Sequence, residues 1–194
     1  VRNERLPAGR QVSQGELAAL MDACARDDGP AGVRDAAIIG LLYAAGGMRR
    51  AEIVTLNRED YDSETGELRV RGKGSKDRVV PLHAVAIRAL ETYLAARGPL
   101  GARDPLFVSW RGRIGKRPII NAVARAGRRL GIRLHPHLFR HTFTTELLNR
   151  RADLRVIQTL LGHESLETTE IYTHVSPGRR REAIDLLGDI VGGH

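Results

Sequence analysis

The chain has 194 residues, which suits one domain with a short extra arm and is enough to bury a sizeable core. Its formal net charge of +8 and isoelectric point of about 10.5 favour a polyanionic partner such as nucleic acid, although a solvated basic surface has the same balance. The single cysteine, Cys24, excludes an intrachain disulfide and a cysteine metal cluster, and no apolar run is long enough to cross a bilayer.

Residues 1–12 are polar and basic, which is typical of a linker or arm. Ser13 and Glu16 then form a capping-box pattern at the start of an amphipathic helix, in which Cys24 is expected to be a core residue. An Asp-Gly-Pro sequence ends this helix. A second helix, apolar enough to be a central core element, is predicted at roughly 33–45.

Gly46 and Gly47 predict a tight turn at a helix boundary, followed by a short helix over 50–56. Arg49 stands beside the start of that helix, where free backbone N–H groups favour anions, so it is well placed for a phosphate. Taken alone, Arg49 is explained more simply by a surface ion pair with Glu52, three residues later.

The pattern changes in residues 59–82, where apolar and charged residues alternate and strands are predicted near 67–71 and 77–81. The turn between these strands, GKGSKD, lacks the nucleotide-binding loop pattern but can present a lysine at the tip of a hairpin. Lysine is scarce in this arginine-rich chain, and two of its three lysines, Lys73 and Lys76, are in this turn.

The second half of the chain is predicted to be mainly helical, with helices over 83–97, 118–130, 137–150, 153–161 and 178–191 and a short helix or turn over 165–172. Residues 99–117 are loop-like, and Trp110 within them either touches DNA or is a partly buried anchor. The expected fold class is therefore α+β, mainly α-helical, with a small antiparallel β-hairpin that carries Lys73.

Four chemically active residues stand out in residues 135–175. His137 and Arg140 are three apart, so they share one face of a helix. His163 follows a helix end, and Tyr172 comes nine residues later. Arginine clamps phosphate oxygens, histidine moves protons near neutral pH and tyrosine can form a covalent intermediate, so this set predicts phosphate chemistry.

The segments HLFRH and LLGHESLETTEIYTHV resemble the active-site region of the tyrosine recombinases, closest to the bacterial Xer and integrase type. That resemblance asks for an arginine in a Gly-φ-Arg-x-x-Glu motif, which Arg49 fits. It also asks for a hairpin lysine about two dozen residues later, which Lys73 fits. It covers about residues 10–190 and implies the catalytic-domain fold of that family. The spacing from Tyr43 to Arg49 is one residue longer than is common in the family.

The resemblance implies a role for each matching residue. Arg49 and Arg140 would hold the nonbridging oxygens of the scissile phosphate and stabilise the added charge of the transition state. Tyr172 would attack phosphorus to give a 3′-phosphotyrosyl bond and a free 5′-hydroxyl. His137 would act as its base or hydrogen-bonding partner.

Lys73 would protonate the leaving 5′-oxygen, a task for which arginine is poorly suited because it does not readily give up its proton. His163 would pack against the active site and hydrogen-bond to it. No metal or nucleotide cofactor is expected, because two arginines supply the positive charge and the phosphotyrosyl bond conserves the energy of the ester.

Further DNA contacts are expected from Arg50, Lys76, Arg78, Arg111 and His141. His141 is four residues after His137, a spacing seen in zinc sites. Because no acidic or third ligand accompanies the pair, no metal site is expected there.

As a whole, the resemblance implies a site-specific DNA recombinase or integrase that acts on a double-stranded recombination site. It implies a homo-tetramer on DNA and a monomer alone, in a bacterial or phage-type cytoplasm and without a membrane. The alternatives are a type IB topoisomerase-like strand transferase, a non-catalytic DNA-binding relative and a metal-dependent nuclease.

The expected organisation is a linker or arm over 1–12, a catalytic domain over 13–177 and a C-terminal helix or tail over 178–194. We expect the core-binding domain that precedes the catalytic domain in the family to be absent, and hence a catalytic fragment with weak, salt-dependent DNA binding. The C-terminal helix docks either on its own domain or on a neighbouring subunit. Deletion of 178–194 is expected to spare cleavage at a single site.

Overall fold

The structure is a computed structural model that describes residues 10–27, 29–72, 77–162 and 177–188. The helices are α1 (Gln14–Ala25), α2 (Pro30–Ala44), α3 (Arg50–Thr55), α4 (Ala84–Arg97), α5 (Lys116–Arg129), α6 (Pro136–Asn149), α7 (Leu154–Leu161) and α8 (Pro177–Asp185). The other elements are the 3-10 turn η1 (Arg58–Asp60) and the strands β1 (Tyr61–Asp62), β2 (Glu67–Val70), β3 (Arg78–Pro81), β4 (Val108–Ser109) and β5 (Gly112–Arg113). The expected mainly helical α+β fold is confirmed. None of the described helices is long and apolar enough to span a membrane.

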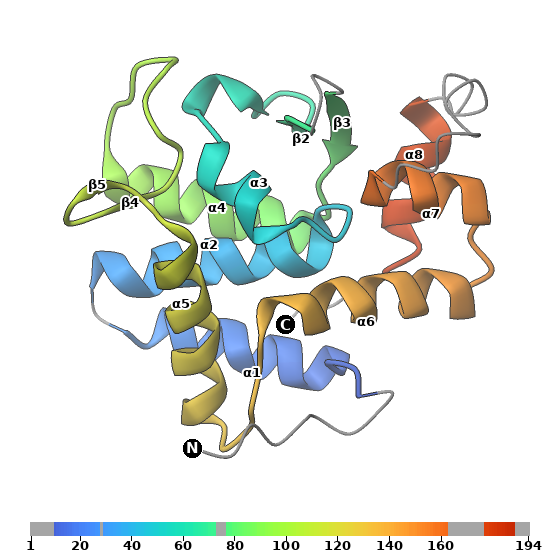
Figure 1. The fold of residues 1–194 in the computed structure, drawn as a ribbon, viewed down its shortest axis with the longest axis horizontal. Coiled ribbons are helices and arrows are strands. Elements are labelled where there is room, and N and C mark those ends of the chain that lie inside the picture. Colours follow the sequence, from blue (N-terminus) through green and yellow to red (C-terminus); the bar gives the residue numbers. More distant parts are fainter. Residues whose placement is uncertain (1–9, 28, 73–76, 163–176, 189–194) are drawn as a thin grey trace.

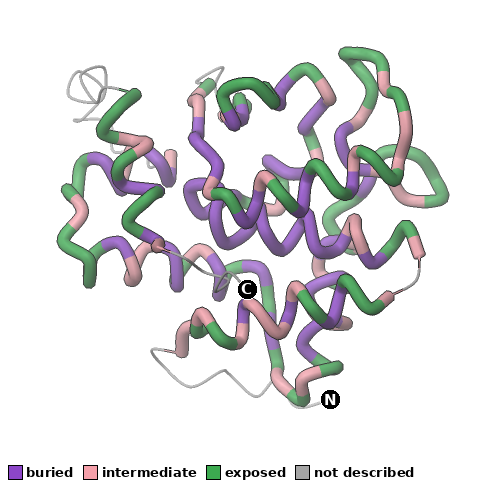
Figure 2. The backbone as a smooth tube through the Cα atoms, turned by 180° about the vertical axis from the view of Figure 1, so that it is seen from behind, coloured by how far each residue is buried: buried purple, intermediate pink, exposed green. Residues whose placement is uncertain are grey.

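Helix α2 is the centre of the molecule, with α1, α4, α5 and α6 packed against it (Figure 1). Residues 35–48 are all buried, and Figure 2 shows this buried stretch running through the interior. A helix that is apolar on all sides is stable only inside a protein, so this burial follows from the sequence. The helix begins at Pro30, earlier than the predicted 33, because proline at the first position has a φ suited to the helix.

Helix α1 begins with the predicted capping box. The Ser13 hydroxyl accepts from the Glu16 backbone N–H at 3.1 Å, and the Glu16 carboxylate accepts from the Ser13 backbone N–H at 2.9 Å. Cys24 is buried as expected, and burial, followed by the charge of Asp35, raises the pKa of its thiol to about 11. Asp35 also accepts from Arg125 and so ties α5 to α2.

Strands β2 and β3 are antiparallel, with Leu68 opposite Val80 and Val70 opposite Arg78. Leu68, Val70 and Val80 are fully buried. Because residues two apart on a strand point to the same face, Arg78 shares the inner face of the sheet with Val80. Strand β1 completes the sheet and was not predicted, since two residues are too few for an alternating pattern.

Helix α8 packs on its own domain. Ile184 and Leu187 are fully buried, and the Arg181 guanidinium donates to the carbonyl oxygens of Leu82 and Thr65, both at 2.9 Å. This arrangement is one of the two docking alternatives drawn from the sequence. Because these residues belong to the core, deleting them would expose apolar surface. The expectation that such a deletion spares cleavage therefore no longer holds.

Candidate active site

The turn between α2 and α3 brings Arg49 to the C-terminal end of α7. Gly46 and Gly47 have φ angles of +65° and +60°, which L side chains rarely adopt. A Cβ on Gly46 would lie 2.9 Å from the Leu160 carbonyl oxygen, and one on Gly47 would lie 2.9 Å from Leu161 Cδ2. Glycine is therefore required at both positions of this turn, because the turn approaches the end of α7 closely. This doubled glycine accounts for the longer spacing from Tyr43 to Arg49.

Glu52 is a buried carboxylate that binds two arginines. It accepts from the Arg49 backbone N–H at 2.7 Å and from Arg49 Nη1 at 3.2 Å. It also accepts from both terminal nitrogens of Arg78, at 2.9 and 3.1 Å. The simple Arg49–Glu52 pair considered from the sequence is thus present, but its carboxylate is only 7% exposed and is shared with a second cation.

The surroundings of Glu52 keep it ionised. Burial by itself raises its pKa, but the hydrogen bonds and charge of Arg78, together with those of Arg49, outweigh burial and lower the pKa below the ordinary value. A carboxylate that is ionised at neutral pH therefore pairs with the Arg49 side chain, which is 45% exposed.

The C-terminal end of α7 receives one guanidinium from each of three different elements. The hydrogen bonds run from Arg78 Nε to the Leu160 carbonyl (3.0 Å), from Arg140 Nη2 to the Leu161 carbonyl (2.9 Å) and from Arg49 Nη2 to the Gly162 carbonyl (3.4 Å). The last carbonyls of a helix have no partner within it and form the negative end of its dipole. They therefore gather three cations that are far apart in the sequence.

Arg140 extends from α6 and also donates from Nη1 to the Gly47 carbonyl at 2.5 Å. Burial lowers its pKa to about 10, and the positive charge of Arg49 adds to this effect. The guanidinium is still protonated at neutral pH. Three arginines thus surround the single carboxylate of Glu52, and the excess positive charge suits a bound anion such as a phosphate.

The first turn of α6 holds two histidines. His135 is the N-cap residue, and its Nδ1 accepts from the Leu138 backbone N–H at 3.2 Å. Burial, and then the neighbouring His137, lower the pKa of His135. His137 is exposed in that first turn, and His141 is exposed one turn further along. No three His, Cys, Asp or Glu side chains among the described residues are grouped to hold a metal ion.

Lys73, Lys76, His163 and Tyr172 lie outside the described residues, so their predicted roles stay predictions. Their place in the chain is nevertheless informative. Lys73 and Lys76 are in the connection between β2 and β3, and His163 directly follows Gly162, whose carbonyl accepts from Arg49.

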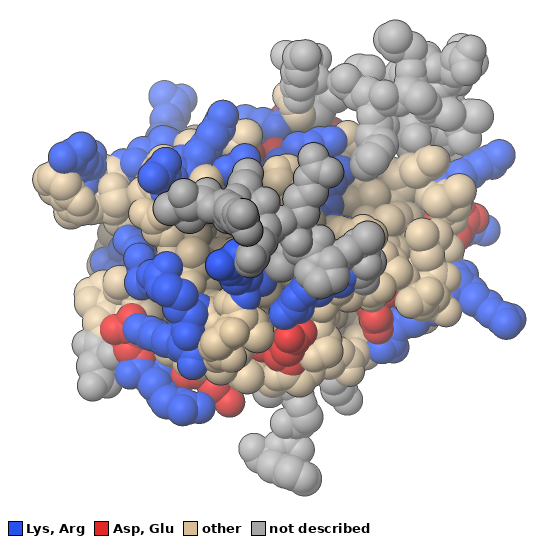
Figure 3. Space-filling model, turned by 60° about the horizontal axis from the view of Figure 1, so that its bottom comes forward, with Lys and Arg blue, Asp and Glu red and all other residues tan. Residues whose placement is uncertain are grey.

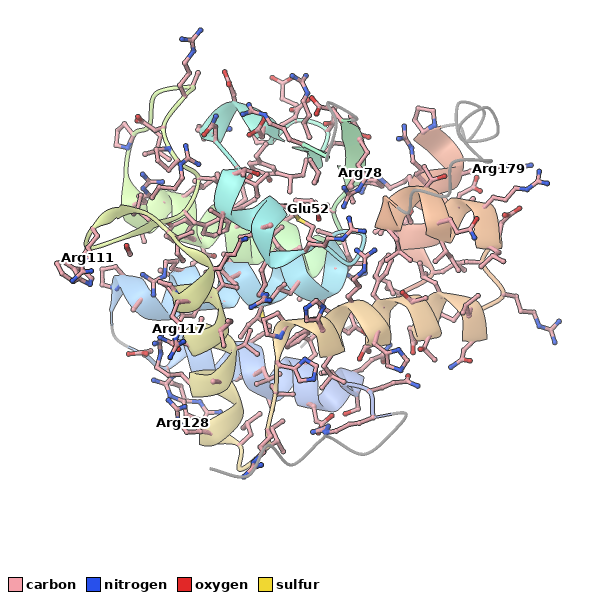
Figure 4. All side chains as sticks on the ribbon, in the orientation of Figure 1. Glu52, Arg78, Arg111, Arg117, Arg128 and Arg179 are labelled. Atoms are coloured by element: carbon pink, nitrogen blue, oxygen red, sulfur yellow. The ribbon has the colours of Figure 1, made fainter. Side chains whose placement is uncertain are left out.

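The predicted DNA contact by Arg78 is corrected by the structure. Its side chain is only 10% exposed and is engaged by Glu52 and by the Leu160 carbonyl, so Arg78 lies inside the protein (Figure 4). The sequence contained a signal for this position: Arg78 is two residues before the buried Val80 on the same strand.

Two other predicted DNA contacts are accessible. Arg50 is half-buried at the first position of α3, and Arg111 is exposed at the turn between β4 and β5. Trp110 beside it is 86% exposed, which rules out the buried-anchor interpretation. The Arg111 guanidinium carbon lies 4.2 Å from the centre of the Trp110 ring, a cation–π contact.

The sequence reasoning missed the basic outer face of α5. Arg117 and Arg128 are eleven residues apart, which is close to three helical turns, and both are exposed. No described residue forms a hydrogen bond or ion pair with either guanidinium group. Arg117 and Arg128 project from α5 on the side away from Glu52, and Arg111 of the β4–β5 turn lies on the same side (Figure 4). Figure 3 shows basic side chains widely spread over one face of the molecule, with acidic ones in small groups.

The sequence pattern of the phage integrase family matches residues 10–179. Tyrosine recombinase XerC of Pelobacter propionicus is 43% identical over 187 residues, which cover 95% of this chain and 61% of that protein. The chain thus spans about three fifths of the length of this relative.

Two solved structures show the same architecture. XerA recombinase is 35% identical with a TM-score of 0.71, and the match covers 89% of this chain and 63% of that one. XerH site-specific recombinase, in a post-cleavage complex with a palindromic difH substrate, is 29% identical with a TM-score of 0.68. That match covers 96% of this chain and 55% of the XerH chain.

Proposed function

Because this chain belongs to the phage integrase family, we propose that it cleaves and rejoins DNA as a site-specific recombinase of the tyrosine type. The observation that carries the proposal is the convergence of Arg49 and Arg140 on adjacent carbonyls at the end of α7. Two cations held side by side, next to the segment that contains His163 and Tyr172, are what phosphoryl transfer requires.

Both arginines have hydrogen-bonding capacity left for a phosphate. A guanidinium carries five N–H donors. Arg49 and Arg140 each use two nitrogens in bonds to described residues. The remaining donors would bind the nonbridging oxygens of a scissile phosphate, whose negative charge increases in the pentavalent transition state.

In the proposed reaction the Tyr172 oxygen bonds to phosphorus while the bond from phosphorus to the 5′-oxygen breaks. The phenolic proton passes to His137 or is shared with it, and the 5′-oxygen takes a proton from Lys73. His163 supports the site by a hydrogen bond. The reverse reaction rejoins the strand, so neither a metal ion nor ATP is needed to supply energy.

The proposed partner is a double-stranded recombination site, bound in a bacterial or phage-type cytoplasm. The basic outer face of α5, together with Arg111 at the β4–β5 turn, offers exposed cations to the DNA backbone. Arg50 is half-buried and directly follows Arg49, and His141 is exposed and directly follows Arg140. Both would therefore contact DNA near the scissile phosphate. Assembly as a tetramer on two duplexes, from a monomer in solution, is part of the proposal and follows from the family resemblance.

Covalent capture tests this function. The chain would be mixed with a pool of nicked duplexes whose sequence is randomised around the nick. The nick is used because cleavage beside it releases a short DNA fragment, and loss of that fragment prevents religation. We expect a protein–DNA adduct that forms in excess chelator without ATP, and none with Tyr172→Phe, which should still bind DNA. An adduct on another residue, or a strict need for a divalent ion, would contradict the proposal. Relaxation of supercoils without exchange between two captured duplexes would favour the topoisomerase alternative.

A further inference from the structure

Arg78 links three parts of the candidate site that are distant in the sequence. It lies on β3, Glu52 lies on α3 and Leu160 lies at the end of α7. The guanidinium donates twice to Glu52, at 2.9 and 3.1 Å, and once from Nε to the Leu160 carbonyl, at 3.0 Å. With a side chain only 10% exposed, it is enclosed by the protein and is not offered to DNA.

The planar guanidinium makes this link rigid. Two parallel bonds fix the orientation of the Glu52 carboxylate, and the third bond lies in the same plane. A Cβ on Gly162 would lie 3.0 Å from Arg78 Nη1, so the guanidinium also packs closely against the cap of α7. Lysine carries its three N–H donors on one tetrahedral nitrogen, so it cannot reproduce the planar arrangement of these three bonds.

Each bond of Arg78 leads to one of the two arginines proposed to hold the phosphate. Glu52 accepts from the backbone and side chain of Arg49, so the orientation of Glu52 sets that of Arg49. The Leu160 carbonyl is adjacent to the Leu161 carbonyl, which accepts from Arg140. Movement of the α7 end would therefore displace the Arg140 guanidinium as well.

We propose that Arg78 is a positioning residue that sets the separation and orientation of Arg49 and Arg140 for a single scissile phosphate. The inference rests on the proposed function and extends it to a residue that touches no DNA. It further predicts that Arg78 affects the rate of the chemical step and not the affinity for DNA.

The test compares Arg78→Lys with Arg97→Lys. Arg97 is a matched control, because it is half-buried and donates to the carbonyls of Pro105 and Leu106 but has no link to Glu52. Cleavage by each protein would be followed at saturating concentrations of one nicked duplex taken from the captured pool. We expect Arg78→Lys to cleave ~10- to 100-fold more slowly, the scale of a misplaced reacting group, with unchanged DNA affinity. The control should cleave at the wild-type rate.

A second substrate separates positioning from loss of folded protein. It is the same duplex with a methylphosphonate at the scissile position, which has no negative charge and so depends less on two aligned arginines. The Arg78→Lys defect should shrink several-fold on this substrate, and the ratio of the two rates does not depend on how much protein is folded. A wild-type rate for Arg78→Lys, or an equal defect on both substrates, would overturn the inference alone. No adduct from the wild-type chain would instead overturn the proposed function, and the inference with it.

Discussion

The arginines at the end of α7 and those on the outer face of α5 have opposite surroundings. Arg78 and Arg140 donate hydrogen bonds to backbone carbonyls, and Arg78 also donates to the Glu52 carboxylate. Arg117 and Arg128 are exposed, and their guanidinium groups have no hydrogen bond or ion pair to the part of the chain that the structure describes. The same residue type is therefore used in two ways, fixed in one region and free in the other (Figure 4).

The difference follows from what each region has to do. Stabilising a transition state needs cations already in place, because any reorganisation during the reaction adds to the barrier. Attaching to a DNA backbone needs only charge near phosphates, since release of counterions supplies the driving force. Fixing the arginines at the end of α7 buries them and places like charges close together, which is unfavourable. The negative charge of Glu52 and the negative end of α7 offset this cost.

The largest expected effect comes from removing a fixed cation. Arg140→Ala should lower the rate of adduct formation at saturating DNA by ~100- to 1,000-fold, the usual loss for one group that stabilises transition-state charge. Arg128→Ala, the control from the free group, should cleave at the wild-type rate under the same conditions. Single-turnover cleavage on a captured duplex measures both, and equal losses for the two variants would remove the distinction between the regions.

Glu52→Gln should have the next largest effect, on stability. Loss of one partner of a buried charge pair costs about 3 kcal/mol, because Arg78 is left without its counter-charge. Glu146 forms an ion pair with Arg150, four residues later, at the surface of α6. Glu146→Gln should therefore cost about 0.5 kcal/mol or less. Urea unfolding at neutral pH measures both differences, and equal costs would show that burial of the pair does not matter.

The same variant has a pH signature. Because the pKa of Glu52 is lowered in the folded state, its contribution to stability is present above the pKa of the unfolded chain. That contribution is lost as the pH falls through the lower folded value. Glu52→Gln should therefore unfold with a weaker dependence on acid pH than the wild type does.

The free arginines should act on affinity and its salt dependence. Arg117→Ala and Arg128→Ala should each reduce the slope of log K against log salt by about 1, because each removes one phosphate contact. Binding of a non-specific duplex at several salt concentrations measures the slope. If the slope is unchanged while cleavage falls, these arginines would belong functionally with the fixed group.

The smallest expected effect concerns the cap of α6, the helix that carries Arg140. The pKa of His135 is lowered in the folded state, so its cap contributes fully above the ordinary value of 6.5 and is lost as the pH falls below it. The loss should be about 1 kcal/mol or less, the usual size for an N-cap. His135→Asn keeps an acceptor that does not titrate and should remove this part of the pH dependence. Thermal unfolding across mildly acidic pH would detect it, and an identical profile in the variant would assign the effect to other groups.

Local patterns were sufficient to predict much of the fold. The capping box of Ser13 and Glu16 and the apolar run of α2 act through residues a few positions apart, so the sequence contains all the partners. The pair His137 and Arg140 was found in the same way, as a fixed spacing within one helix, whereas the motif around Arg49 was found through the family resemblance.

Only the tertiary structure decided which groups the internal arginines bind. Nothing within a few residues of Arg78 indicates that Glu52, twenty-six positions earlier, or Leu160, eighty-two positions later, will be its partners. The same holds for Trp110, which the folded chain leaves 86% exposed, and for Ile184, which it buries on its own domain. Burial and ion pairing depend on which segments meet in space, and a carboxylate or a helix end brought beside a cation changes its role without changing the local sequence.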